Sequence, residues 1–178
     1  MNIANKLTVF RVILIPFFVL FMLTDFWEYN RWVAFGIFVV ATITDKLDGS
    51  IARKYNLISN FGKFMDPIAD KLLVCSALIC LTVSGNIPAW ITIIIIAREF
   101  IISGIRLIAS DNGVTIAASW WGKSKTIAQM TMIIIMLLNV PVFHILGQIA
   151  MYVSLVLTII SAVDYIIKNR SVISLGDM

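Results

Sequence analysis

Histidine, cysteine and proline are scarce in this chain of 178 residues, which has one histidine, two cysteines and four prolines. Cys75 and Cys80 are five residues apart in one apolar stretch. On a helix their Cα atoms would be roughly 8 Å apart, which is too far for a disulfide. Both cysteines are therefore expected to serve in packing. His144, the only histidine, stands alone and is not expected to bind a metal ion.

Charged residues are also few, at 13% against 60% hydrophobic residues, and the mean hydropathy is +0.97. A soluble domain of this size carries about twice as much charge. The composition therefore predicts an integral membrane protein. The net charge of +4 fits an inner face that meets anionic lipid, although topological bias explains it equally well, and nucleic-acid binding is not predicted.

Long linkers, repeats and low-complexity segments are missing as well, so residues 1–178 are expected to form a single domain. The apolar stretches are each close to the roughly 20 residues that a helix needs to cross a bilayer. They lie at 6–24, 30–52, 64–83, 87–110, 119–140 and 143–167. The expected fold is therefore all-α and polytopic, with six transmembrane helices.

The start of the chain has a pattern of its own. Ile3, Leu7, Phe10 and Leu14 would share one helical face, which predicts a short amphipathic segment in the membrane surface. No small-residue cleavage site follows the first apolar stretch, so it is expected to be a retained span and not a signal peptide.

Basic residues mark the orientation, because cytoplasmic loops carry an excess of Lys and Arg. They cluster at alternate ends of the expected spans, at Lys6, Arg11, Arg53, Lys54, Lys63, Arg106, Lys123, Lys125, Lys168 and Arg170. Only Arg31 lies in the opposite loops. The pattern predicts a multi-pass protein of the cytoplasmic (inner) membrane with both termini in the cytoplasm.

Four aspartates stand inside two of these apolar stretches, where a bare negative charge is costly. Asp45 and Asp48 are three residues apart, and Asp66 and Asp70 are four apart, so each pair lies along one face of its helix. The connection between the two stretches is short, so the helices should be antiparallel neighbours. The four carboxylates are then expected to converge in one cavity that faces the cytoplasm.

Four carboxylates in one cavity repel one another unless they are protonated or neutralised. Oxygen ligands without nearby histidine or cysteine favour Mg²⁺, Mn²⁺ or Ca²⁺ over zinc. Two divalent ions would balance the four charges, and two is the number that we predict.

Small and basic residues accompany the acids. Gly49, Ala52 and Gly62 either allow close helix contact or make room for a bound ring or sugar, and both interpretations stay open. Arg53 is placed either to bind phosphate oxygens or to anchor the helix at the inner surface.

A second basic group follows later in the chain. Arg98 lies about ten residues into its stretch, at a depth where a cation faces the protein interior or a wet cavity. It either forms a buried ion pair, with Glu99 or one of the aspartates, or contributes to an anion pocket. That pocket could also include four further basic residues, Arg106, Lys123, Lys125 and Arg11. Alternatively, their side chains could be solvated or face lipid.

The eight residues form the pattern Asp45-x-x-Asp48-Gly49-x-x-Ala52-Arg53, then eight residues, then Gly62-x-x-x-Asp66-x-x-x-Asp70. This pattern resembles the complete signature of the CDP-alcohol phosphotransferase family. The six expected spans fit the fold of that family. Within it, the opening NKLTVFRVILIPFFV and the segment AREFIISGIR resemble members that use glycerol 3-phosphate as the acceptor.

The resemblance implies transfer of the phosphatidyl group of CDP-diacylglycerol to glycerol 3-phosphate, with Mg²⁺ or Mn²⁺ as cofactor, usually as two ions. Asp45, Asp48, Asp66 and Asp70 would bind the metals, and Asp70 would also be the catalytic base. The CDP moiety would be held by Asp48, Gly49, Ala52, Arg53 and Gly62. Members of the family form homodimers, which is the assembly expected here.

The acceptor phosphate is expected to meet Arg98, Arg106, Lys123 and Lys125, helped by Asn5, Thr8 and Arg11. Two alternatives remain at this point. The same chemistry could use another acceptor, such as inositol phosphate or serine, although a basic pocket favours a phosphorylated one. A divalent cation transporter would also place carboxylates in membrane helices, but it would distribute polar groups across the whole depth of the membrane.

Overall fold

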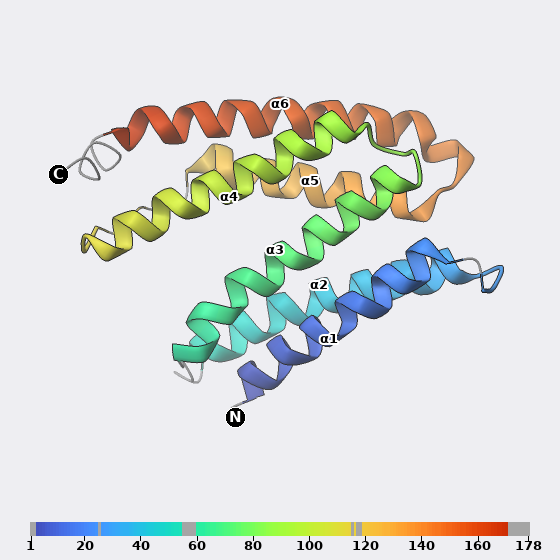
Figure 1. Ribbon diagram of the computed structural model, residues 1–178, viewed down its shortest axis with the longest axis horizontal. Coiled ribbons are helices and arrows are strands. Elements are labelled where there is room, and N and C mark those ends of the chain that lie inside the picture. Colours follow the sequence, from blue (N-terminus) through green and yellow to red (C-terminus); the bar gives the residue numbers. More distant parts are fainter. Residues whose placement is uncertain (1–2, 25, 55–59, 115, 117–118, 171–178) are drawn as a thin grey trace. The chain divides into compact units, whose positions relative to one another are not determined.

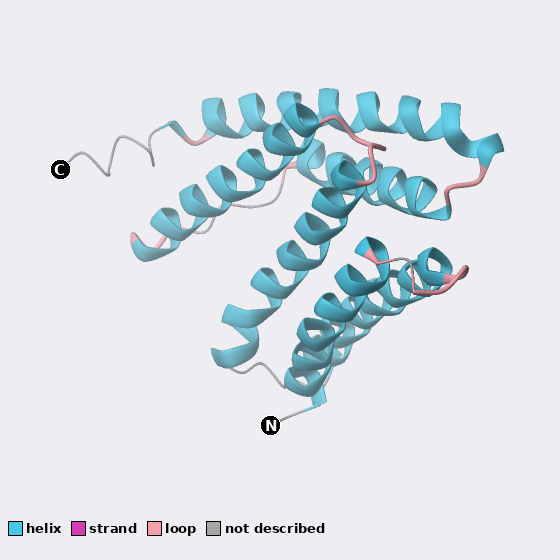
Figure 2. Ribbon diagram, turned by 45° about the vertical axis from the view of Figure 1, so that its right-hand side comes forward, coloured by secondary structure: helices cyan, strands magenta, loops and turns pink. Residues whose placement is uncertain are grey.

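The structure is a computed structural model that describes residues 3–24, 26–54, 60–114, 116 and 119–170, with side chains except those of 3–4, 46–54 and 60–64. Helices make up almost all of the described chain, which contains no strand (Figure 2). The chain divides into two compact units, residues Met1–Asn86 and Ile87–Met178.

The first unit consists of three helices. They are α1 (Ile3–Leu23), α2 (Asn30–Lys54) and α3 (Asn60–Val83). Helix α1 packs closely against both α2 and α3, whereas α2 and α3 approach each other much less. The start of α1, the end of α2 and the start of α3 lie at the same end of this unit (Figure 1). The predicted antiparallel arrangement of α2 and α3 is therefore confirmed, with α1 as the helix that joins them.

The second unit contains α4 (Ala89–Asp111), α5 (Trp120–Leu138), the short 3₁₀ helix η1 (Pro141–Phe143) and α6 (His144–Lys168). Helix α6 packs along both α5 and α4. Helices α4 and α5 share fewer close backbone contacts with each other than either shares with α6. Helix α6 is thus the common partner within this unit.

Local residue choices explain where the helices of the second unit begin and end. Ser119 caps α5, and its hydroxyl oxygen accepts a hydrogen bond from the Gly122 amide at 3.1 Å. Helix α5 ends at Asn139, which adopts the left-handed conformation with φ 49° that asparagine tolerates better than most residues. Gly113, with φ 72°, ends the turn after α4 in the same way.

Each unit has an apolar core built from these helices. In the first unit the rings of Phe18 and Phe38 lie 5.8 Å apart, where α1 meets α2. The neighbouring Ala34 and Ala41 are fully buried, and their small side chains allow the two backbones to approach. In the second unit Met132 of α5 and Met151 of α6 are fully buried. Both cysteines are reduced, as predicted.

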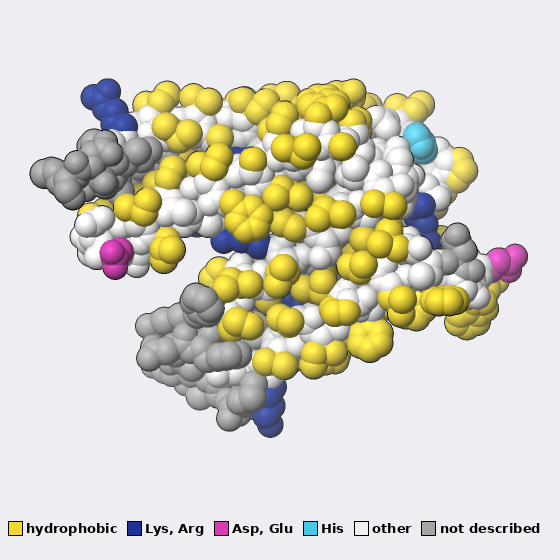
Figure 3. All heavy atoms as spheres, viewed as in Figure 1, with side chains coloured by type: hydrophobic (Ala, Val, Ile, Leu, Met, Phe, Trp, Pro, Cys, Tyr) yellow, Lys and Arg dark blue, Asp and Glu magenta, His cyan; other side chains and the backbone are white. Residues whose placement is uncertain are grey.

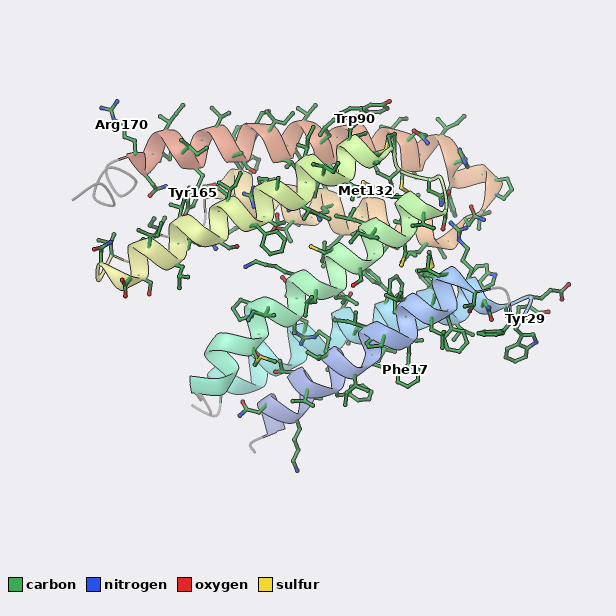
Figure 4. The ribbon with its side chains drawn as sticks, viewed as in Figure 1. Phe17, Tyr29, Trp90, Met132, Tyr165 and Arg170 are labelled. Atoms are coloured by element: carbon green, nitrogen blue, oxygen red, sulfur yellow. The ribbon has the colours of Figure 1, made fainter. Side chains whose placement is uncertain are left out.

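The surface of the helices is unusually apolar. Hydrophobic side chains cover much of the face seen in Figure 3, and Phe17 points outward from α1 in Figure 4. By length and composition, Asn5–Leu23 and Pro141–Lys168 are long and apolar enough to cross a membrane. The other helices carry more charged or polar residues. These features fit membrane association.

The six predicted helical stretches are confirmed as six α-helices in the described chain, with ends that differ from the predicted ones by at most four residues. That all six cross the membrane stays a prediction. The predicted amphipathic segment at the start is not a separate element but forms the first turns of α1. It is part of this helix because its polar residues Asn5 and Thr8 are buried inside the first unit.

Candidate active site

The aspartate motif lies on the two helices that meet at one end of the first unit. Asp45 is near the end of α2, and Asp66 and Asp70 are one turn apart near the start of α3. All three are half-buried. The remaining motif residues fall outside the described side chains, so their predicted roles stay predictions. These are Asp48, Gly49, Ala52, Arg53 and Gly62.

Helix α1 contacts an acid on each of the other two helices. The Thr8 hydroxyl donates a hydrogen bond to Asp66 Oδ1 at 2.5 Å. Arg11 Nη1 lies 2.7 Å from Asp45 Oδ1 and forms an ion pair with it. Thr8 and Arg11 are fully buried, and Asn5, one turn before Thr8, is nearly so. These contacts tie α1 to the carboxylates of the motif.

Sequence reasoning missed these two contacts. It identified Asn5, Thr8 and Arg11 as polar residues at the start of an apolar stretch and predicted that they would help to bind the acceptor phosphate. Their spacing of three residues already placed them on one helical face. What the spacing could not reveal is that this face packs between α2 and α3, where the nearest polar groups are carboxylates.

The donor chemistry of the motif fits a hard divalent cation. Aspartate oxygens are suitable ligands for Mg²⁺, Mn²⁺ or Ca²⁺, and no histidine or cysteine lies in the motif. Among the described side chains, no group of three or more acids, histidines or cysteines is gathered closely enough to hold a metal ion. The side chain of Asp48, the fourth acid, is outside that set.

A second cluster of charges lies in the other unit, between α4 and α5. Glu99 accepts from Arg98 Nη1 at 3.2 Å, and it also forms an ion pair with Lys125. The side chain of Lys125 is only 3% exposed, and that of Arg98 is 12% exposed. Arg98 therefore forms the ion pair with Glu99 that one of its two interpretations predicted, and its role in an anion pocket stays a prediction. Two cations share one carboxylate, so the trio keeps a net positive charge.

Arg106 and Lys123 complete the predicted basic set of the second unit. Arg106 Nε donates to the Tyr165 hydroxyl at 3.3 Å, and its guanidinium lies 5.6 Å from the centre of that ring. Tyr165 extends from α6 (Figure 4) and is 2% exposed, whereas Arg106 and Lys123 are exposed. The sequence analysis did not identify Tyr165, because this residue lies 59 positions from Arg106 and no local pattern links the two.

Comparison with known proteins identifies relatives over nearly the full chain. The profile described as CDP-alcohol phosphatidyltransferase matches residues 1–160. A protein of Bacillus subtilis named CDP-diacylglycerol--glycerol-3-phosphate 3-phosphatidyltransferase is 39% identical over 94% of this chain and 95% of its own. A protein of the same name from Haemophilus influenzae is 43% identical over 93% and 91%. A probable phosphatidylglycerophosphate synthase of Mycobacterium tuberculosis is 40% identical over 94% and 81%.

Proposed function

The chain belongs to the CDP-alcohol phosphatidyltransferase family, and from this membership we propose that it transfers the phosphatidyl group of CDP-diacylglycerol to sn-glycerol 3-phosphate. The products would be phosphatidylglycerophosphate and CMP. The observation that carries the proposal is that relatives named for this reaction match more than nine tenths of the chain at about 40% identity. The aspartate motif on α2 and α3 supplies residues suited to the chemistry.

In the proposed reaction, the 1-hydroxyl oxygen of glycerol 3-phosphate forms a bond to the β-phosphorus of CDP-diacylglycerol. The bond from that phosphorus to the oxygen shared with CMP breaks, and CMP leaves with this oxygen. Asp70 accepts the proton of the attacking hydroxyl. Asp70 is suited to this role because it is half-buried on α3 and so can face both a substrate and the protein interior.

The other motif residues would bind the nucleotide and its charge. Asp45, Asp48, Asp66 and Asp70 are the residues that would hold Mg²⁺ or Mn²⁺, which we propose as two ions. Such cations, when bound, neutralise charge on the diphosphate. Gly49, Ala52 and Gly62 would leave room for the CDP moiety, and Arg53 would contact its phosphate oxygens.

The phosphate of the acceptor is proposed to bind to the basic residues of the second unit. Arg98 and Lys125 both pair with Glu99, so these three side chains together carry one net positive charge. Arg106 and Lys123 are exposed and can reach a soluble anion. Arg106 is the better oriented of the two, because Tyr165 holds its guanidinium by a hydrogen bond and by its ring.

We propose that the chain is a single functional domain that spans the cytoplasmic membrane six times, with both termini and the site on the cytoplasmic side. The exposed apolar faces of the helices and the basic residues at alternate ends support this placement. It suits a reaction between a lipid and a soluble anion. A homodimer is proposed from the family resemblance alone.

A comparison of acceptors tests the proposed reaction. Purified protein in detergent receives CDP-diacylglycerol, Mg²⁺ and one alcohol at a time, namely glycerol 3-phosphate, inositol phosphate or serine. CMP release and the lipid product are measured. Glycerol 3-phosphate is expected to give the fastest CMP release, together with phosphatidylglycerophosphate. Release of CMP with a different alcohol only would contradict the acceptor, and divalent cation flux in proteoliposomes without any lipid product would favour a transporter.

A further inference from the structure

Thr8 and Arg11 of α1 reach the two helices that carry the aspartate motif. The Thr8 hydroxyl is 2.5 Å from Asp66 Oδ1, and Arg11 Nη1 is 2.7 Å from Asp45 Oδ1. Helix α1 itself contributes no residue to the family motif. It nevertheless supplies a hydrogen-bond donor to one motif carboxylate and a positive charge to another.

The buried face of α1 is polar at this end of the unit and apolar beyond it. Asn5, Thr8 and Arg11 are buried in succession, and the same face continues with Ile15 and Phe18. A buried arginine in an apolar helix is costly unless it has a charged partner. The buried polar residues of α1 thus lie at the end of the helix that contacts Asp45 and Asp66.

A direct role in binding the acceptor phosphate fits these contacts less well. The side chain of Arg11 is 0% exposed and already faces a carboxylate, whose own side chain is 37% exposed. An incoming phosphate would have to displace Asp45 and separate a buried ion pair, which is strongly unfavourable. Asp45 is the accessible member of the pair, and Arg11 lies behind it.

We infer that Thr8 and Arg11 are positioning residues of the proposed metal site, with Thr8 orienting Asp66 and Arg11 serving as the permanent counter-charge of Asp45. This inference rests on the proposed function, in which these aspartates bind Mg²⁺ or Mn²⁺. A carboxylate has two oxygens, so a contact at one of them fixes its direction without ending its capacity to bind a cation. Residues that orient metal ligands in this way strongly influence metal affinity.

The Thr8 contact is tested by Mn²⁺ binding to the detergent-solubilised protein without substrates, followed by the electron paramagnetic resonance signal of free Mn²⁺. Thr8→Val keeps the shape of the side chain and removes the donor, so Mn²⁺ binding should weaken about tenfold. Thr8→Ser keeps the donor and should bind as wild type does. Mn²⁺ binding by Thr8→Val equal to that of wild type would overturn the inference.

Thr42→Val is the matched control. Thr42 lies on α2 in the same unit, and its hydroxyl donates to the Phe38 carbonyl of its own helix at 2.8 Å. The same exchange of atoms should therefore leave Mn²⁺ binding unchanged. If wild-type protein itself binds no Mn²⁺, the proposed metal site fails, and that result is distinct from equal binding by wild type and Thr8→Val.

The Arg11 contact predicts that its loss makes the protein depend more on Mn²⁺, whereas loss of the Thr8 contact weakens Mn²⁺ binding. Arg11→Gln leaves the acids without their resident cation, so the metal-free protein should unfold at a lower temperature. Added Mn²⁺ should then raise the unfolding temperature by more than it does in wild type, because it supplies the missing positive charge. If Arg11→Gln is recovered in folded form only when Mn²⁺ is present, that result would also support the role of Arg11 as a counter-charge. Arg11→Lys should behave as wild type, and a Mn²⁺-induced rise in Arg11→Gln no larger than in wild type would refute this role.

Discussion

At the scale of single residues, three partly buried acids each have a partner of opposite sign or a hydrogen-bond donor. Asp45 faces Arg11, Asp66 accepts from Thr8, and Glu99 faces Lys125. Charges in an apolar protein are costly unless they are compensated in this way. Asp70 is the motif acid that we propose as the base, and its role can be separated from its contribution to folding.

Asp70→Asn is expected to abolish phosphatidyl transfer while leaving the protein folded. The amide cannot accept the proton of the acceptor hydroxyl, and removing one of several neighbouring negative charges does not by itself destabilise the fold. The rate of CMP release should fall by at least about a hundredfold, the usual contribution of a general base. The unfolding temperature serves as the control, and turnover at the wild-type rate would exclude Asp70 as the base.

At the scale of secondary-structure elements, the first turns of α1 bury polar side chains against their neighbours, while large apolar side chains lie on the outer face of the helix. Phe10 and Phe17 are about half exposed, whereas Thr8 and Arg11 have no exposed surface. A helix in a soluble protein would show the opposite distribution. The arrangement suits a helix surrounded by lipid, because apolar side chains meet the hydrocarbon and polar groups find partners inside the protein.

Helices α4 and α5 depend on each other in a different way. Their backbones approach less closely than either approaches α6, and a side-chain link joins Glu99 of α4 to Lys125 of α5. Gly122 of α5 lies near Arg98, since a Cβ atom at Gly122 would be 3.8 Å from Arg98 Nη2. The ion pair is therefore a direct side-chain link between two helices whose backbones stay apart.

Glu99→Gln is expected to destabilise the second unit, because it removes the carboxylate with which both Arg98 and Lys125 form ion pairs. Removing one partner of a buried ion pair costs about 3–5 kcal/mol, and the partial exposure of Glu99 places the expected loss at the lower end of this range. Thermal unfolding in detergent measures the loss. The double variant Glu99→Gln, Lys125→Met should recover part of it.

The control for this prediction is Lys123→Met, which removes an exposed lysine two residues away from Lys125 on the same helix. Its unfolding temperature should stay close to that of wild type. Equal unfolding temperatures for Glu99→Gln and wild type would show that the ion pair does not join α4 to α5.

At the scale of the whole molecule, the charges within the helices bear on how many of them cross the membrane. Within the part of the chain that the structure describes, Asn5–Leu23 and Pro141–Lys168 are long and apolar enough to cross a membrane, whereas the other helices carry more charged or polar residues. Several of those charges have partners inside their own unit, as Glu99 and Lys125 do. Compensated charges cost less in a membrane than the composition alone suggests.

Cysteine labelling distinguishes six spans from two. In a variant with alanine at Cys75 and Cys80, one new cysteine replaces either Ser84, after α3, or Asn112, after α4. Both positions are exposed. Six spans predict that a membrane-impermeant maleimide labels Ser84→Cys in intact cells, but Asn112→Cys only after the membrane is opened. Equal labelling of the two variants would contradict six spans, because α4 would then not separate them.

The positions of the helices and the chemistry of the motif follow from the amino-acid sequence. Apolar stretches bounded by turn residues specify where helices form. A spacing of three or four residues places Asp45 with Asp48, and Asp66 with Asp70, on one face of a helix. Helix formation and the sharing of a face depend only on neighbours along the chain. The tertiary structure alone decided which residues meet across the helices. Thr8 and Asp66 are 58 residues apart, and Arg106 and Tyr165 are 59 apart. Such contacts depend on which helix faces are buried together, and a polar residue in an apolar stretch does not reveal its partner until the helices have packed.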